Sequence, residues 1–272
     1  MEKHLDFLES RQADYFGVPL HCLTMDEAFA SIEGFIRSGA AHRITVVNAA
    51  VIIWCLQNPR LREAVCTADL VLCDGMGLMY ASRLLGRPLP EMLSGPLVME
   101  RLVRHAAVQG YSVYFLGAKK EMVEGAVRRY LEKYPGLKIA GYHDGYFSRM
   151  EEPEIIRTIK EARPQILLVA MGSPREELFI YENLQELGVP LCLDVGGAFD
   201  VAAGMTKLAP KWMRLAGLEW FYRLIQEPRR LWKRYATVIP WFVFLVLRQL
   251  ITDRPAKSRI LRAMDDVLMG RG

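Results

Sequence analysis

The sequence has few cysteines, and their spacing matches neither a metal site nor a disulfide framework. Five cysteines are scattered through 272 residues without a CxxC pair. Cys55, Cys73 and Cys192 lie inside apolar runs, where a reduced, buried thiol is usual. The histidines are far apart, and His21 beside Cys22 has no further ligand-type residue at metal-binding spacing. We therefore expect a cytoplasmic protein with no metal and no cofactor.

Signatures of several common protein classes are also missing. There is no Walker loop, and Gly75-Met-Gly77 supplies only the first half of a GxGxxG pattern, so classical dinucleotide binding is weakly supported. The N-terminus, Met-Glu-Lys-His-Leu-Asp, has no signal-peptide pattern. No internal repeat or low-complexity tract is visible. Function must therefore be argued from strand ends and from charge.

Short apolar runs that end at turns alternate with segments of helical spacing. The expected strands are 44–47, 70–73, 112–116, 137–140, 166–170 and 191–195. This alternation predicts an α/β fold, a doubly wound Rossmann-like parallel sheet with helices on both faces. We assign residues 1–204 to this domain and 205–272 to a C-terminal helical, membrane-associating appendage.

Glycines follow strand after strand and should collect on one edge of the sheet, where open α/β sheets bind their ligands. Asp74 lies at this edge, directly after the run Leu70–Cys73. A carboxylate in this position is a candidate general base. The alternative is that Asp74 only caps the helix expected at 78–85.

Other carboxylates near strand ends compete with Asp74 for a catalytic role. His143 and Asp144 are neighbours that could form an acid–base pair, although a loop histidine is more often structural. Asp200 is better explained as a residue that caps or orients a loop. Asp194 lies inside an apolar strand, which indicates a structural carboxylate that is hydrogen-bonded.

Charge is unevenly distributed along the chain. Residues 207–272 carry fourteen Lys/Arg and five Asp/Glu, a balance of +9, so residues 1–206 carry −5 of the overall +4. A basic C-terminal part on a mildly acidic body suggests an anionic partner: a phosphate-bearing ligand, anionic lipid or nucleic acid. A basic face that is merely solvated is the alternative.

An apolar run, Ala236–Leu247, follows the basic residues. It has twelve residues and contains Pro240, too short to span a bilayer, which takes about twenty. Its aromatic and aliphatic composition favours insertion into one leaflet over nucleic-acid binding. A helix buried in a core or a subunit interface is the alternative. We expect the appendage to dock onto the glycine-rich edge only with a membrane or a partner subunit present.

An ordered set of motifs spans about residues 15–235. Its members are Asn48, Asp74-Gly75, Gly95, Phe115-Leu-Gly117, Gly141-Tyr-His-Asp-Gly-Tyr-Phe147, Gly172-Ser-Pro-Arg-Glu-Glu177, Val195-Gly-Gly-Ala-Phe-Asp200, Ala209-Pro-Lys-Trp212 and Glu219-Trp-Phe-Tyr-Arg223. Each piece alone is weak, but in this order they resemble the WecG/TagA/CpsF glycosyltransferases, family 26.

The resemblance implies an activity and a place. These enzymes move a sugar from a UDP-sugar, typically of the N-acetylmannosamine type, to a polyprenyl-diphosphate-linked sugar, with inversion and without a known metal. They serve teichoic acid, enterobacterial common antigen, capsule or exopolysaccharide synthesis. The resemblance implies a cytoplasmic protein, peripheral at the inner face of the plasma membrane, whose basic appendage completes the site. A homo-oligomer or a partner subunit stays open.

The resemblance also implies roles for individual residues. Asp74 corresponds to the general base, Asn48 to a substrate-binding asparagine, and Arg223 and Arg230 to appendage arginines that face the diphosphate. Arginines suit this role because their planar fork binds two oxygens at once. The further substrate-binding candidates are Thr45, Gly75, Gly95, Gly172, Ser173, Glu176, Gly196 and Gly197.

Three positions depart from the family pattern. The family often has Thr-x-Asn at the end of the first strand. In this chain the residue two places before Asn48 is Val46, and the threonine, Thr45, lies one place earlier. It often has an arginine at the position of Met92 and a glutamine at that of Glu176. The methionine at position 92 removes a ligand-binding positive charge, and the glutamate at position 176 adds a negative charge. They indicate an altered substrate or a loss of activity, so a non-catalytic subunit that binds a nucleotide sugar or a lipid is the alternative function.

Overall fold

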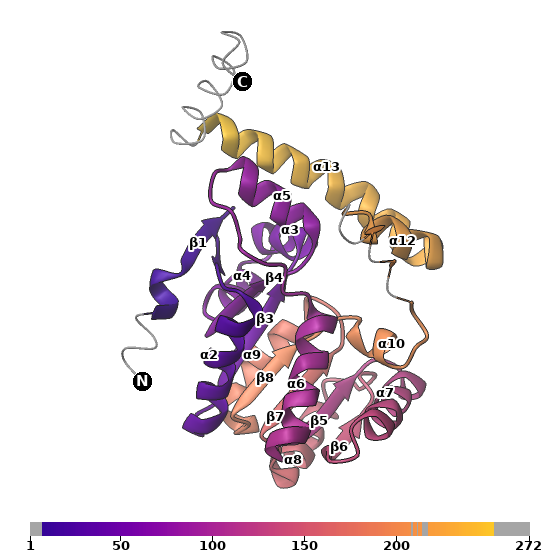
Figure 1. The fold of residues 1–272 in the computed structure, drawn as a ribbon. Coiled ribbons are helices and arrows are strands. Elements are labelled where there is room, and N and C mark those ends of the chain that lie inside the picture. The colour runs from indigo at the N-terminus through magenta and orange to yellow at the C-terminus, as the bar shows by residue number, and fades with distance from the viewer. Residues whose placement is uncertain (1–6, 208, 211, 214–216, 253–272) are drawn as a thin grey trace.

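A six-stranded parallel sheet organises the protein (Figure 1). The computed structural model describes residues 7–207, 209–210, 212–213 and 217–252. The strand order is β4-β3-β8-β7-β5-β6, and every neighbouring pair is parallel. The strands are β3 His42–Val47, β4 Leu70–Cys73, β5 Ser112–Gly117, β6 Lys138–His143, β7 Ile166–Ala170 and β8 Leu191–Asp194. The predicted doubly wound sheet is therefore confirmed.

Helices cover both faces of this sheet (Figure 1). Side chains alternate along each strand, so Val46 joins the apolar cluster on one face and Val47 the cluster on the other. The first face carries α2 Met25–Ser38, α6 Gly95–Gln109 and α7 Lys120–Lys133. The second carries α3 Ala49–Gln57, α4 Pro59–Cys66, α5 Met76–Leu84, α8 Glu152–Ala162 and α9 Arg175–Leu187. Burial on both faces explains why the strands are almost continuously apolar.

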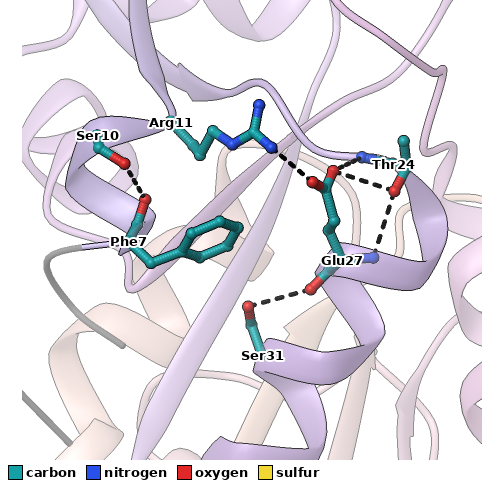
Figure 2. A network of polar contacts seen from close by, with 6 residues as sticks. All are labelled: Phe7, Ser10, Arg11, Thr24, Glu27 and Ser31. Carbon is teal, nitrogen blue, oxygen red and sulfur yellow. Dashed lines mark hydrogen bonds and ion pairs between the residues drawn. The ribbon is translucent and has the colours of Figure 1, made fainter. Parts of the chain in front are cut away.

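Helix α2 begins with a capping box formed by Thr24 and Glu27 (Figure 2). The backbone N–H of Glu27 donates to Thr24 Oγ1 at 3.3 Å, and the backbone N–H of Thr24 donates to Glu27 Oε2 at 2.8 Å. Two of the backbone donors that a helix start leaves without a partner are thereby satisfied. Arg11 pairs with the same carboxylate at 2.7 Å, which ties the entry segment to the helix.

Two further features precede β4. The segment around Phe16 is the turn of a hairpin between β1 Gln12–Tyr15 and β2 Val18–His21. Helix α3 ends at Asn58 and α4 starts at once, because the Asn58 side chain accepts hydrogen bonds from the backbone amides of Arg60 and Leu61. The Asn-Pro pair thus ends one helix and begins another.

The C-terminal part is helical, as predicted, and comprises α12 Glu219–Gln226 and α13 Pro228–Thr252, which follow the short helix α10 Ala198–Ala202. Figure 1 shows α13 running across α5 and α3. Val238, Phe242 and Val246 are buried in the apolar cluster of that face. The appendage is thus docked on the α/β body in this structure. That docking requires a membrane or a partner subunit stays a prediction.

One expectation about α13 is wrong. The twelve-residue apolar run was expected to be too short to span a bilayer. In the structure, residues on both sides of the run continue the same helix, which includes Pro240, so the helix is longer than the run itself. Leu231–Thr252 is long and apolar enough to cross a membrane, by length and composition alone. One side of α13 packs on the body, whereas Trp241, Phe244 and Leu247 are exposed.

Candidate functional site

A cavity of about 820 Å³ opens at the carboxyl ends of the central strands. Asn48 follows β3, Asp74 follows β4, Gly172 follows β7 and Gly196 follows β8, and all four line it. Ser173, Gly95 and Gly197 line it too. The sequence argument that strand-end residues gather at one edge is therefore confirmed for these positions.

Asp74 is held at the end of β4 by backbone contacts. Its N–H donates to the Val47 carbonyl at 2.8 Å, and the Leu93 N–H donates to the Cys73 carbonyl at 2.9 Å. Gly75, at φ +91°, makes the turn into α5 and is itself the N-cap residue. No side chain caps α5, so the interpretation of Asp74 as a helix cap is wrong. Its carboxylate remains available to the cavity.

The environment of Asp74 suits proton transfer near neutral pH. Burial raises its pKa to about 6, and the Arg223 guanidinium is the largest influence that opposes this rise. The Glu219 carboxylate raises the pKa further, whereas the Gly95 backbone N–H and Arg234 lower it. A carboxyl with this pKa is mostly ionised at pH 7 and can still accept a proton readily, as a general base must.

The appendage supplies cations to the cavity. Arg223 lines it, and the guanidinium is oriented by Glu219 one helical turn earlier, at 3.1 Å. Arg234 of α13 lines the same cavity. Arg229 is exposed, and the side chain of Arg230 lies outside the described part of the chain. The predicted role of Arg223 beside Asp74 thus has a geometric basis, whereas that of Arg230 stays a prediction.

Glu176 is a buried residue at the cavity. Its Oε2 accepts hydrogen bonds from the backbone N–H groups of Met171 at 3.1 Å and Gly172 at 2.9 Å. Burial, with Glu177 and Asp194 nearby, raises its pKa well above the ordinary range. A raised pKa favours the protonated form of the carboxyl, which is the form closer to the glutamine of the family pattern. Glu176 lines the cavity and braces the loop after β7.

Other sequence-based assignments change as well. Thr45 is buried inside β3, and Val46 rather than Thr45 lines the cavity, so we withdraw Thr45 as a direct ligand contact. Met92 packs against the apolar cluster of α3 and α5. Asp194 accepts a hydrogen bond from the Val46 N–H at 2.9 Å, as expected for a hydrogen-bonded carboxylate, and it also lines the cavity.

The His143–Asp144 pair does not form the acid–base contact that the sequence left open. His143 Nδ1 lies 2.6 Å from the backbone carbonyl of Asp144, and the Asp144 carboxylate accepts from the Tyr146 N–H. The neighbouring Gly145 and Tyr146, rather than this pair, line the cavity. This geometry leaves Asp74 as the stronger candidate for the base.

Sequence reasoning missed two cations at the cavity. Lys119 lines it just after the Gly117 turn, at a strand end whose glycine was a usable signal. Arg175 donates to the carbonyls of Gly145 and Phe147, both at 2.7 Å, and so positions the loop after β6. Within the described residues, no three His, Cys, Asp or Glu side chains are grouped so that they could hold a metal ion.

A comparison with known proteins places the chain in a family. The model of the glycosyl transferase WecG/TagA/CpsF family matches residues 13–256. The chain belongs to this family. The predicted resemblance is confirmed, and the matched range contains both the cavity and the docked appendage.

Three relatives of the chain share one enzyme name. Proteins from Bacillus spizizenii and Bacillus subtilis are each 34% identical to the chain, over 75% and 76% of it and 78% and 79% of their own lengths. A protein from Staphylococcus aureus is 28% identical over 93% of the chain and 96% of its own length. All three are named N-acetylglucosaminyldiphosphoundecaprenol N-acetyl-beta-D-mannosaminyltransferase. The chain is a glycosyltransferase, which sets aside the non-catalytic subunit.

Proposed function

We propose that this member of the WecG/TagA/CpsF family moves an N-acetylmannosamine-type sugar from UDP to a polyprenyl-diphosphate-linked N-acetylglucosamine, with inversion. The position of Asp74 between strand-end glycines and appendage arginines carries the proposal. The names of the relatives support this sugar and this acceptor. The product would enter bacterial cell-surface polysaccharide synthesis.

Each part of the site has a task in this reaction. Asp74 takes the proton from the attacking acceptor hydroxyl, whose oxygen forms the new bond to the anomeric carbon. The bond from that carbon to UDP breaks on the opposite side, which inverts the centre. Arg223 and Arg234 stabilise the negative charge that grows on the departing diphosphate. Backbone amides of the Gly172–Ser173 and Gly196–Gly197 turns are suited to holding the donor.

We further propose that the protein is peripheral at the cytoplasmic face of the membrane. A spanning helix would need lipid on all its sides, but Val238, Phe242 and Val246 pack on the α/β body. The opposite side exposes Trp241 and Phe244, which suit the interfacial region. Helix α13 would therefore lie in the plane of the membrane surface, and the basic residues near α12 would favour anionic lipids.

The decisive experiment incubates the purified protein with a panel of UDP-sugars and a short-chain prenyl-diphosphate N-acetylglucosamine. Mass spectrometry should detect one added N-acetylhexosamine with a UDP-N-acetylmannosamine donor, and NMR should show the inverted anomer. Asp74→Asn should abolish most transfer, whereas Asp144→Asn, after the strand β6 at the opposite edge of the sheet, should not. Absence of transfer with every donor, or a retained anomer, would refute the proposal.

A further inference from the structure

A second hollow of about 700 Å³ adjoins the cavity and differs from it in character. It is a groove between α5 and α13, and its far part is walled by Tyr80, Leu84, Val243 and Leu247. We call it the α5–α13 groove. Gly75, a predicted substrate-binding residue, lines this groove and not the first cavity.

The two hollows meet at the candidate catalytic residues. Asn48, Asp74, Arg223 and Arg234 line both of them. Asp74 is therefore approached from two sides: from the strand-end glycines and from the apolar groove. A transferase that joins two substrates needs such an arrangement, with one substrate on each side of the base.

The groove changes from polar to apolar along its length. On α13 its lining recurs every three or four residues from Arg234 to Leu250, which spans about 24 Å of helix. The opposite wall follows Met76, Tyr80 and Leu84, one turn apart on α5. Charged side chains thus lie at the Asp74 end, where Arg223 and Arg234 accompany Asp200, Glu219 and Glu227, and the far end is lined by apolar side chains and Tyr80. A ligand that fits has a charged head and a long apolar tail.

The apolar walls are open to solvent in this structure. Leu84 is 59% exposed, Val243 49% and Leu247 54%. An apolar chain laid between them would remove their surface from water, which is favourable in proportion to the area covered. The groove is continuous with the site where the polar head of such a molecule would react, so its occupant is a substrate rather than a bulk lipid.

We propose that the α5–α13 groove binds the first isoprenoid units of the acceptor and that the cavity at the strand-end glycines binds the donor. The acceptor diphosphate would lie near Arg223 and Arg234, and the acceptor sugar at Asp74. This assignment rests on the proposed function and adds which surface recognises the lipid. It makes the length of the prenyl chain a determinant of binding.

The kinetic test compares two acceptors with the same sugar-diphosphate head in detergent micelles: one with a chain of eleven isoprenoid units and one with a single unit. The groove variant is Val243→Gln with Leu247→Gln. Its matched control is Val108→Gln with Leu131→Gln, two exposed residues of α6 and α7 that lie outside both hollows and outside the appendage. Each pair makes two exposed apolar residues polar.

The proteins should differ in their preference for the long chain. We expect kcat/KM for the long acceptor, divided by that for the short one, to fall about tenfold or more in the groove variant and less than about twofold in the control. Activity with the short acceptor should stay near that of the wild type. An unchanged ratio in the groove variant, or an equal fall in the control, would overturn the proposal.

A binding test separates this proposal from the reaction itself. A polyprenyl diphosphate that carries a photoreactive diazirine on its second isoprenoid unit should label α5 and α13 of the full-length protein. Excess unlabelled polyprenyl diphosphate should compete, and excess phosphatidylglycerol should not. Such labelling without any sugar transfer would sustain the groove and refute the proposed function. Labelling elsewhere, or equal competition by phosphatidylglycerol, would refute the groove.

Discussion

Arg223 of α12 lowers the pKa that burial imposes on Asp74 at the end of β4. The two residues come from different parts of the chain, one from the appendage and one from the α/β body. The ionisation of the candidate base therefore depends on the appendage being docked. The end of β4 and helix α12 are thus coupled through one guanidinium.

Replacing Asp74 with Asn should reduce activity and raise stability. Without the carboxylate, kcat should fall about 10²–10⁴-fold. Because folding raises the pKa from 3.8 to about 6, the wild type loses stability as the pH rises through this range. The Asn variant avoids that loss and should be up to about 3 kcal/mol more stable at pH 7, with the gain vanishing towards pH 4. Urea unfolding of both proteins at pH 7 and at pH 4 measures this difference in the free energy of unfolding.

The pH profile of transfer should report Asp74 directly. Below about pH 6 the carboxylate takes up a proton, so the rate should fall about tenfold per pH unit. Arg223→Gln removes the cation that lowers this pKa and leaves Glu219, which raises it, so the acidic limb should move to higher pH. Arg229→Gln, at an exposed position of α13, is the control and should leave the limb in place. Identical limbs in all three proteins would contradict the assignment of Asp74.

The sequence was informative where local chemistry alone decides the structure. Apolar runs such as Leu70–Cys73 predict buried parallel strands, and the parallel arrangement brings the carboxyl ends of these strands to one edge of the sheet. The capping box at Thr24 is equally local. Helix α4 escaped prediction because Asn58-Pro59 suits both the end of one helix and the start of the next. Pro240 suggested an interruption, but α13 continues through it.

The character of individual site residues was harder to predict, because it depends on the neighbours. The raised pKa of Glu176 follows from burial beside Glu177 and Asp194, which come from α9 and β8 and meet only in the fold. Thr45 and Val46 face opposite sides of β3, and only the orientation of the strand decides which one lines the cavity. The threonine lies one residue away from its position in the family motif, and Thr45 was therefore wrongly assigned as a ligand contact.

Glu176 supplies a prediction about the loop after β7. Glu176→Gln should not lower stability at pH 7, because the amide oxygen can still accept from Met171 and Gly172 and the variant does not have to take up a proton on folding. Glu176→Ala leaves these buried N–H groups without their acceptor and should cost about 1–3 kcal/mol. Since folding raises the pKa of Glu176 above 4.5, wild-type stability falls as the pH rises, and the Gln variant should show a shallower decline. Urea unfolding at pH 6 and pH 9 tests both; equal losses for Gln and Ala would contradict the hydrogen-bond role.

The last prediction concerns the appendage as a whole. A chain ending at residue 204 retains all six strands and the helices α2 to α10, so its circular dichroism should remain that of a folded α/β protein. It loses the cover that Phe242 and Val246 give to the face of α3 and α5, and we expect it to need detergent. A matched full-length control, Arg223→Gln, keeps that cover and removes only the cation.

The comparison of these two proteins separates anchoring from catalysis. The truncated protein should bind no liposomes and should transfer no sugar, even to a water-soluble acceptor, because Arg223 and Arg234 no longer face the diphosphate and water enters the site. Arg223→Gln should bind liposomes normally and transfer poorly to either acceptor. If the truncated protein serves the water-soluble acceptor at the full-length rate, the appendage is only an anchor. Asp74 would then act without help from α12, because its carboxylate would meet the acceptor equally well without the guanidinium.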